Sequence, residues 1–175
     1  CVGGLISLTT VISASLMSLA GFGIPLTVVV VLCVGAIVGV ANGYLAAKIK
    51  IDAMIITFST NAVVLGIALS VMSAPGGSVP LGFMRLAGYR ILGIPVVFLF
   101  VLVCLLLSFY VLNRSVLGFH IRAVGGDPHA AYSSGISVVR TKILAHLITA
   151  MFAVIAGLFM TARMGSGDPL SGVPF

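Results

Sequence analysis

The stretch PLTVVVVLCVGAIVGVANGYLAA, residues 25–47, decides the fold. It contains no Lys, Arg, Asp or Glu and is followed directly by Lys48. A membrane-spanning helix needs about 20 predominantly apolar residues, and this stretch is long enough to provide them. Further runs without these charged residues lie at 53–84, 91–113 and 143–162. The chain is therefore predicted to be a helical integral membrane protein that crosses the bilayer several times.

The overall composition supports the same interpretation. Of the 175 residues, 61% are hydrophobic and 7% are charged, and the mean hydropathy is +1.32. A water-soluble domain has too little interior to bury this much apolar surface. The formal net charge of +6 does not indicate nucleic acid, because the basic residues lie between apolar runs and form no stripe with interleaved aromatic residues. We expect the lipid bilayer, and not nucleic acid, as a partner.

Turn-forming residues divide the apolar sequence into separate helices. Residues 21–25, GFGIP, interrupt the first charge-free run, and residues 73–80, SAPGGSVP, open a loop that extends to about residue 93. The predicted fold class is an all-α, polytopic bundle of about five transmembrane helices without a water-soluble domain. The predicted spans lie near 2–20, 25–47, 53–72, 94–112 and 143–162.

The basic residues also predict an orientation. Cytoplasmic loops of membrane proteins carry an excess of Lys and Arg. If the 48–52 and 113–142 loops face the cytoplasm, the outer side holds only Arg85, Arg90 and Arg163. The inner side then holds the other six basic residues, which are Lys48, Lys50, Arg114, Arg122, Arg140 and Lys142. We therefore expect 113–142 to be a cytoplasmic loop.

Small residues at four-residue spacing predict where the helices meet. Gly35, Gly39 and Gly43 form one flat face on the second predicted span, and Ala153 and Gly157 form another on the fifth. Such faces let helix backbones approach closely in lipid, where no hydrophobic effect drives helices together. The faces are interpreted as helix packing within the subunit, with a dimer interface as the alternative.

The sequence contains little that indicates catalysis. It has no G-x-x-x-x-G-K-[ST] nucleotide loop and no H-E-x-x-H motif. Cys1, Cys33 and Cys104 lack the spacing of a metal site. Ser166 and Asp168 have no histidine nearby in the sequence with which to form a nucleophilic triad. We expect no metal, no cofactor and no enzymatic activity on this chain.

The charged residues also argue against an ion-driven carrier. Such carriers usually keep ionisable groups inside the membrane. The acidic residues are Asp52, Asp127 and Asp168, all in loops or at span ends, and only His146 falls inside a predicted span. If the protein transports a solute, the free energy is expected to come from another chain.

Uncharged polar residues indicate a possible path for a solute. Thr57, Thr60 and Asn61 share one face of the third predicted span, and their hydroxyl and amide groups suit a neutral polyol such as a sugar. The alternative is structural, because threonine often bonds to its own helix and asparagine often links helices. Asn42, beside the glycine face of the second span, is interpreted as a packing residue.

Residues 125–136, GGDPHAAYSSGI, form the most distinctive motif. Asp127 can cap a helix N-terminus, Pro128 suits the first helical position, and Gly135 can end the helix. An isolated polar helix this short is hardly stable in water. We therefore expect it to be held against something, which on a cytoplasmic loop is plausibly a soluble partner.

This motif resembles the cytoplasmic coupling loop of ABC importer permeases of the ribose type and, more distantly, of the branched-chain amino acid type. Residues 2–8, VGGLISL, the Ala41-Asn42-Gly43 stretch, and Ala156 through Gly172 are similar to further family segments. The resemblance assigns coupling to an ATPase to Gly125, Gly126, Asp127, Pro128, Ala130, Ala131, Ser134 and Gly135.

The resemblance implies a permease subunit of an ATP-driven importer of a ribose-type monosaccharide in the bacterial inner membrane. Its implied partners are an ATP-binding cassette subunit that hydrolyses the ATP, a second permease subunit and a periplasmic substrate-binding protein. Residues 1–175 are expected to be a single permease domain truncated at both ends. The alternatives are an ion-coupled secondary carrier, a permease for branched-chain amino acids, and a membrane scaffold without transport activity.

Overall fold

Long apolar helices dominate the computed structural model, which describes residues 1–19, 23–49, 52–91 and 94–174. Part of the predicted break at 21–25 and Lys50 lie outside these residues. Within them, four helices are long and apolar enough to cross a membrane, and α1 is a shorter apolar helix. This confirms the predicted all-α, polytopic membrane fold. The long helices are α1 (Val2–Leu19), α2 (Ile24–Lys48), α3 (Ala53–Val71), α5 (Val96–Arg114) and α8 (Val138–Met164).

Short elements occupy both segments that the sequence left as loops. The predicted cytoplasmic loop contains two helices, and the first begins where the Ser115 side chain accepts a hydrogen bond of 3.1 Å from the Gly118 amide. The opposite loop contains a helix and a two-residue antiparallel strand pair. The short elements are α4 (Leu81–Gly88), β1 (Arg90–Ile91), β2 (Ile94–Pro95), α6 (Val116–Gly126) and α7 (Pro128–Ser133).

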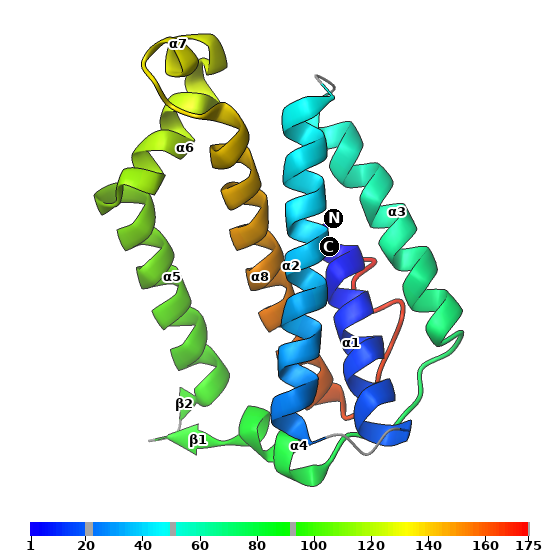
Figure 1. Cartoon of the computed structure of the whole chain (residues 1–175). Coiled ribbons are helices and arrows are strands. Elements are labelled where there is room, and N and C mark those ends of the chain that lie inside the picture. Colours follow the sequence, from blue (N-terminus) through cyan, green and yellow to red (C-terminus); the bar gives the residue numbers. More distant parts are fainter. Residues whose placement is uncertain (20–22, 50–51, 92–93, 175) are drawn as a thin grey trace.

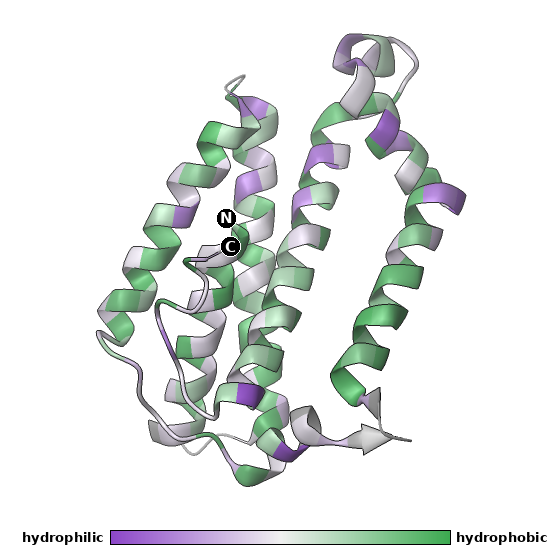
Figure 2. Ribbon diagram, turned by 180° about the vertical axis from the view of Figure 1, so that it is seen from behind, coloured by the Kyte–Doolittle hydropathy of each residue, from purple (hydrophilic) through white to green (hydrophobic). Residues whose placement is uncertain are grey.

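The arrangement of the helices places the short elements at two opposite ends of the molecule. In Figure 1, α6, α7, the C-terminal end of α2 and the N-terminal end of α3 lie at one end, whereas α4 and the β1–β2 pair lie at the other. Hydrophobic residues cover the long helices in Figure 2, and hydrophilic residues are most concentrated around α7. Helix α5 has no buried residue. The core therefore lies among α1, α2, α3 and α8, and Phe83 of α4 packs into one of its clusters.

The glycine face of α2 lies directly against α8. A Cβ atom added at Gly39 would lie 2.7 Å from the Ala150 Cβ, and one at Gly43 would lie 2.5 Å from the Ile143 Cα. A Cβ atom added at Gly35 would lie closer still to the Val154 side chain. Only glycine leaves room for these approaches, so the structure uses this face for packing inside the chain.

The small residues of α8 complete this packing. Ala153 is buried, and a Cβ atom added at Gly157 would lie 2.7 Å from the Thr9 Cβ of α1. The Thr161 hydroxyl, one turn further on, donates to the Gly157 carbonyl oxygen at 2.9 Å and is fully buried. Helix α8 is therefore fixed against both α1 and α2.

The segment after α8 returns along α1 (Figure 1). Gly165 ends α8 with a φ of 71°, a left-handed conformation that favours glycine. Beyond it, the Thr10 hydroxyl donates to the Asp168 carbonyl oxygen at 2.8 Å, and the Gly172 amide donates to the Ser7 hydroxyl oxygen at 2.9 Å. Buried non-helical backbone needs hydrogen-bond partners from the protein, and α1 supplies them here.

Candidate functional site

The side chain of Asp127 forms the start of α7. Its Oδ1 atom accepts hydrogen bonds from the His129 amide at 2.8 Å and the Ala130 amide at 3.3 Å. Pro128 occupies the first turn, where its missing amide hydrogen costs nothing. Two of the amides that a helix N-terminus leaves without partners are thus satisfied by one carboxylate.

The other end of α7 is closed by backbone hydrogen bonds around a glycine. Gly135 has a φ of 82°. Its amide donates to the Tyr132 carbonyl oxygen at 3.0 Å, and the Ile136 amide donates to the Ala131 carbonyl oxygen at 3.0 Å. A residue with a Cβ atom is strained in this left-handed conformation. Helix α7 therefore has fixed ends despite its shortness.

One of the predicted coupling residues is buried against the rest of the protein, and the others form an exposed surface. Ala131 is 4% exposed and faces the protein, because α7 packs on α6 and α8. Tyr132, which the sequence analysis did not include, is 75% exposed. A large aromatic side chain held in the open on a short helix is typical of an anchor at protein interfaces. The other predicted coupling residues are exposed, namely Gly125, Gly126, Asp127, Pro128, Ala130, Ser134 and Gly135.

The three polar residues of α3 that were predicted to line a solute path lie in three different environments. The Asn61 side-chain oxygen accepts a hydrogen bond of 2.6 Å from the Gly4 amide of α1, which is the helix-linking role that the sequence left open. Thr57 lines a cavity, and its hydroxyl donates to the Met54 carbonyl oxygen at 3.0 Å. Thr60 is half-buried. A role of these residues in a solute path stays a prediction.

The cavity that Thr57 lines has a volume of about 270 Å³ and lies between α1, α2, α3 and α8. Polar groups from three helices meet there, since Asn42, His146 and Thr149 also line it. The sequence analysis interpreted Asn42 as a packing residue. Its position next to a glycine face gave no signal that Asn42 lines a cavity.

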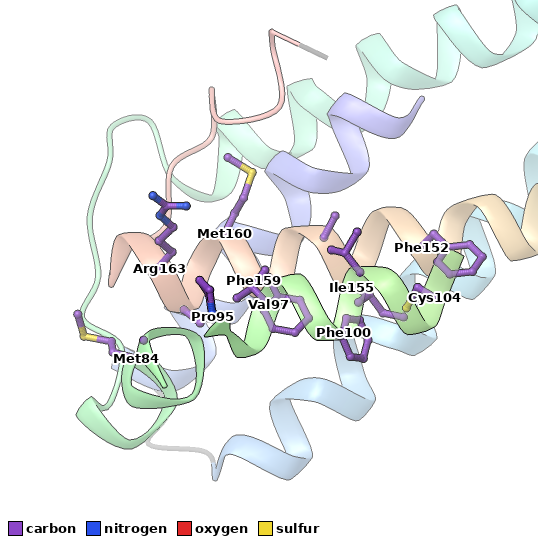
Figure 3. A pocket seen from close by; sticks show the side chains of 14 residues that line it. Met84, Pro95, Val97, Phe100, Cys104, Phe152, Ile155, Phe159, Met160 and Arg163 are labelled. Atoms are coloured by element: carbon purple, nitrogen blue, oxygen red, sulfur yellow. The ribbon is translucent and has the colours of Figure 1, made fainter. Parts of the chain in front are cut away.

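A larger and mainly apolar groove of about 690 Å³ separates α5 from α8. Figure 3 shows its lining, in which Phe100 of α5 and Phe159 of α8 approach each other from opposite sides. Their ring centroids are 4.9 Å apart. Apart from Arg163 at one end, the labelled side chains are apolar. This lining offers van der Waals contact but few partners for a polar solute.

The part of the chain that the structure describes contains no group of three His, Cys, Asp or Glu residues able to hold a metal ion. Cys1, Cys33 and Cys104 are free. The long apolar helices define the class of protein as a multi-pass membrane protein, and the capped, exposed α7 lies at one end of its helix bundle.

The chain belongs to the family described as "Branched-chain amino acid transport system / permease component", whose sequence pattern matches residues 2–175. It is 32% identical to the ribose import permease protein of Haemophilus influenzae over 99% of this chain and 55% of that protein. These findings confirm the resemblance to ABC importer permeases.

Two further relatives carry sugar names. The D-allose transport system permease protein of Escherichia coli K12 is 33% identical over 99% of this chain and 54% of the relative. The L-arabinose transport system permease protein of the same strain is 32% identical over 77% of this chain and 41% of the relative. The chain thus spans about half the length of the curated relatives it matches. No solved structure matches it.

Proposed function

We propose that this chain is part of the membrane-spanning permease subunit of a bacterial ATP-driven importer of a monosaccharide, located in the inner membrane. Membership of the permease family and the sugar names of the relatives support this. The subunit works with an ATP-binding cassette subunit, a second permease subunit and a periplasmic binding protein. ATP is hydrolysed by the cassette subunit, so the permease itself is not an enzyme.

The observation that carries the proposal is the capped, exposed helix α7. An isolated polar helix of six residues has little stability of its own, yet Asp127 and Gly135 fix both ends of α7. A short stiff element can transmit a rigid-body movement of a soluble partner into α6 and α8, on which it packs. The basic side chains of Arg122 and Arg140 are exposed in the flanking helices, so the partner surface is expected to carry acidic groups nearby.

The proposal is tested by purifying the full-length permease in mild detergent together with its ATP-binding subunit. In the variant Tyr132→Ala, recovery of the ATP-binding subunit is expected to fall at least fivefold, because exposed aromatic anchors carry much of the binding free energy at interfaces. Tyr89→Ala is the matched control. Tyr89 is 65% exposed, against 75% for Tyr132, but lies beside β1 at the opposite end of the molecule.

Equal recovery with Tyr132→Ala and Tyr89→Ala argues against coupling through α7. Uptake driven by an ion gradient in the absence of ATP favours the secondary carrier instead. Reconstitution with all partners and no solute movement favours the scaffold.

A further inference from the structure

We propose that the cavity between α1, α2, α3 and α8 is a binding station for one monosaccharide on its way through the membrane, recognised through its hydroxyl groups. We call it the Asn42 cavity, defined by Asn42, Thr57, His146 and Thr149. The inference rests on the proposed function and names a site and a substrate chemistry within it.

The carboxamide of Asn42 is the strongest indication of a ligand. Asn42 is 2% exposed, and its Nδ2 donates to the Cys1 sulfur at 2.9 Å. Its Oδ1 is buried and has no hydrogen-bond partner. A buried amide oxygen without a partner is costly, because water no longer solvates it and no protein group replaces the water. A hydroxyl donor that reaches Oδ1 from the cavity removes that cost.

The neighbouring polar groups present acceptors to the same volume. The Thr57 and Thr149 hydroxyls donate to carbonyl oxygens of their own helices, those of Met54 and Ala145, at 3.0 and 2.9 Å. Each hydroxyl oxygen therefore keeps its capacity to accept from a ligand. A sugar carries several O–H donors on a small ring. The cavity thus matches a donor-rich ligand better than an apolar one.

His146 adds an adjustable group to this lining. Its Nδ1 lies 3.0 Å from the Lys142 carbonyl oxygen, one turn earlier in α8. When Nδ1 carries the hydrogen and donates to that carbonyl, the ring's Nε2 is left as an acceptor. The backbone contact therefore favours the tautomer that adds one more acceptor for a hydroxyl donor.

The lining also indicates a neutral ligand. It contains no Asp, Glu, Lys or Arg among the described residues. A free amino acid brings an ammonium and a carboxylate, and burying both without charged partners is unfavourable. The volume of about 270 Å³ is just below the range of about 300–1,000 Å³ typical of small-molecule sites. One small neutral solute fits these limits better than a branched-chain amino acid.

The depth of the cavity is consistent with a position on a transport path. Asn42 lies six residues from Lys48, and Thr57 lies five residues from Asp52. His146 lies four residues from Lys142, and each of the three is on the side of the charged residue toward the middle of its helix. At a rise of 1.5 Å per residue, they lie about 6–9 Å along their helices from these charged positions. Lys142 also donates to the Ala46 carbonyl oxygen at 3.4 Å, which brings the ends of α2 and α8 together. The Asn42 cavity therefore lies within about two helical turns of the end that carries α7.

The first test compares Asn42→Leu with Asn113→Leu in the full-length permease reconstituted with its partner subunits. Asn113 is exposed at the end of α5 and outside the cavity. Radiolabelled D-ribose, D-allose and L-arabinose serve as probes, and the readout is sugar moved per ATP hydrolysed. For a transported sugar, Asn42→Leu is expected to lower this ratio about two- to tenfold, the effect of one lost hydrogen bond. Equal ratios in the two variants overturn the proposal.

The second test does not depend on ATP coupling and remains informative if Asn42→Leu fails to fold. Thr149→Cys is placed in a full-length permease without its native cysteines and reacted in inside-out vesicles with a water-soluble methanethiosulfonate. We expect reaction, slowed at least threefold by the transported sugar, and no such slowing for Ser133→Cys, which is exposed on α7 outside the cavity. A Thr149→Cys thiol that does not react, or reacts equally with and without each sugar, overturns the proposal.

The two tests also separate this inference from the proposed function. Loss of ATP-dependent uptake in the parent protein together with sugar protection of Thr149→Cys refutes ATP-driven import but supports the binding station. Normal ATP-dependent uptake without protection refutes the station and leaves the importer intact.

Discussion

The Oδ1 atom of Asn61 on α3 accepts a hydrogen bond of 2.6 Å from the backbone amide of Gly4 on α1. The contact joins two helices separated by 57 positions in the sequence. The room for it comes from Gly4, since a Cβ atom there would lie 2.9 Å from the same Oδ1. One asparagine and one glycine thus fix the distance between α1 and α3.

This contact predicts that Asn61→Leu destabilises the protein. The Gly4 amide loses its partner at a site with little access to water, a loss of about 1–3 kcal/mol. Thermal unfolding of the purified full-length permease in detergent measures the effect. Asn113→Leu, at an exposed position, serves as the control and is expected to unfold near the temperature of the parent. Unchanged unfolding of Asn61→Leu together with lower sugar uptake supports the predicted path-lining role instead.

A second prediction concerns the glycine face of α2. A Cβ atom at Gly43 would lie 2.5 Å from the Ile143 Cα, which is backbone and cannot move aside alone. Gly43→Ala is therefore expected to separate α2 from α8 and to cost about 1–3 kcal/mol of stability. Gly66→Ala on α3 is the matched control, since nothing lies within 4 Å of the added atom. The measurement is the unfolding temperature of each variant in the same detergent. We expect a lower value for Gly43→Ala than for Gly66→Ala, and equal values contradict the packing role of Gly43.

Much of the fold could be predicted from the sequence because lipid imposes a simple rule. A long apolar run must form a helix to satisfy its backbone, so charge-free runs mark helices with little ambiguity. Residues 25–47 and 143–162 accordingly fall inside α2 and α8. The short helices α4 and α6 could not be recognised in the same way. They lie in the predicted loops, and their form depends on local caps such as Ser115.

The candidate site could be predicted only where the signal is local. Asp127 and Gly135 act on backbone atoms within a few residues, so their positions in the motif indicate a capped helix. The burial of Ala131 and the exposure of Tyr132 depend instead on how α7 sits on α6 and α8. Likewise, Asn42 and Asn61 look alike in sequence, and only helix packing decides which of them lines a cavity.

A third prediction concerns the end of α7. Gly135 has a φ of 82°, and a substituent with a Cβ atom costs about 1–2 kcal/mol in that region. Gly135→Ala is expected to loosen α7 and to lower ATP hydrolysis stimulated by sugar and binding protein several-fold. Gly66→Ala on α3 is the control, because Gly66 is not among the glycines with a positive φ and the added atom meets nothing within 4 Å. Full stimulation in Gly135→Ala is evidence that the shape of this turn does not matter for coupling.

A fourth prediction separates the cap at Asp127 from its charge. One oxygen, Oδ1, accepts from both His129 and Ala130 amides, and an asparagine side chain offers an oxygen in the same place. Asp127→Asn is therefore expected to bind the ATP-binding subunit like the parent. Asp127→Ala leaves two amides without that partner, which costs about 1 kcal/mol and corresponds to about a fivefold loss of recovery in detergent. If Asp127→Asn is as defective as Asp127→Ala, the carboxylate charge itself contacts the partner, and α7 depends less on its cap than its geometry indicates.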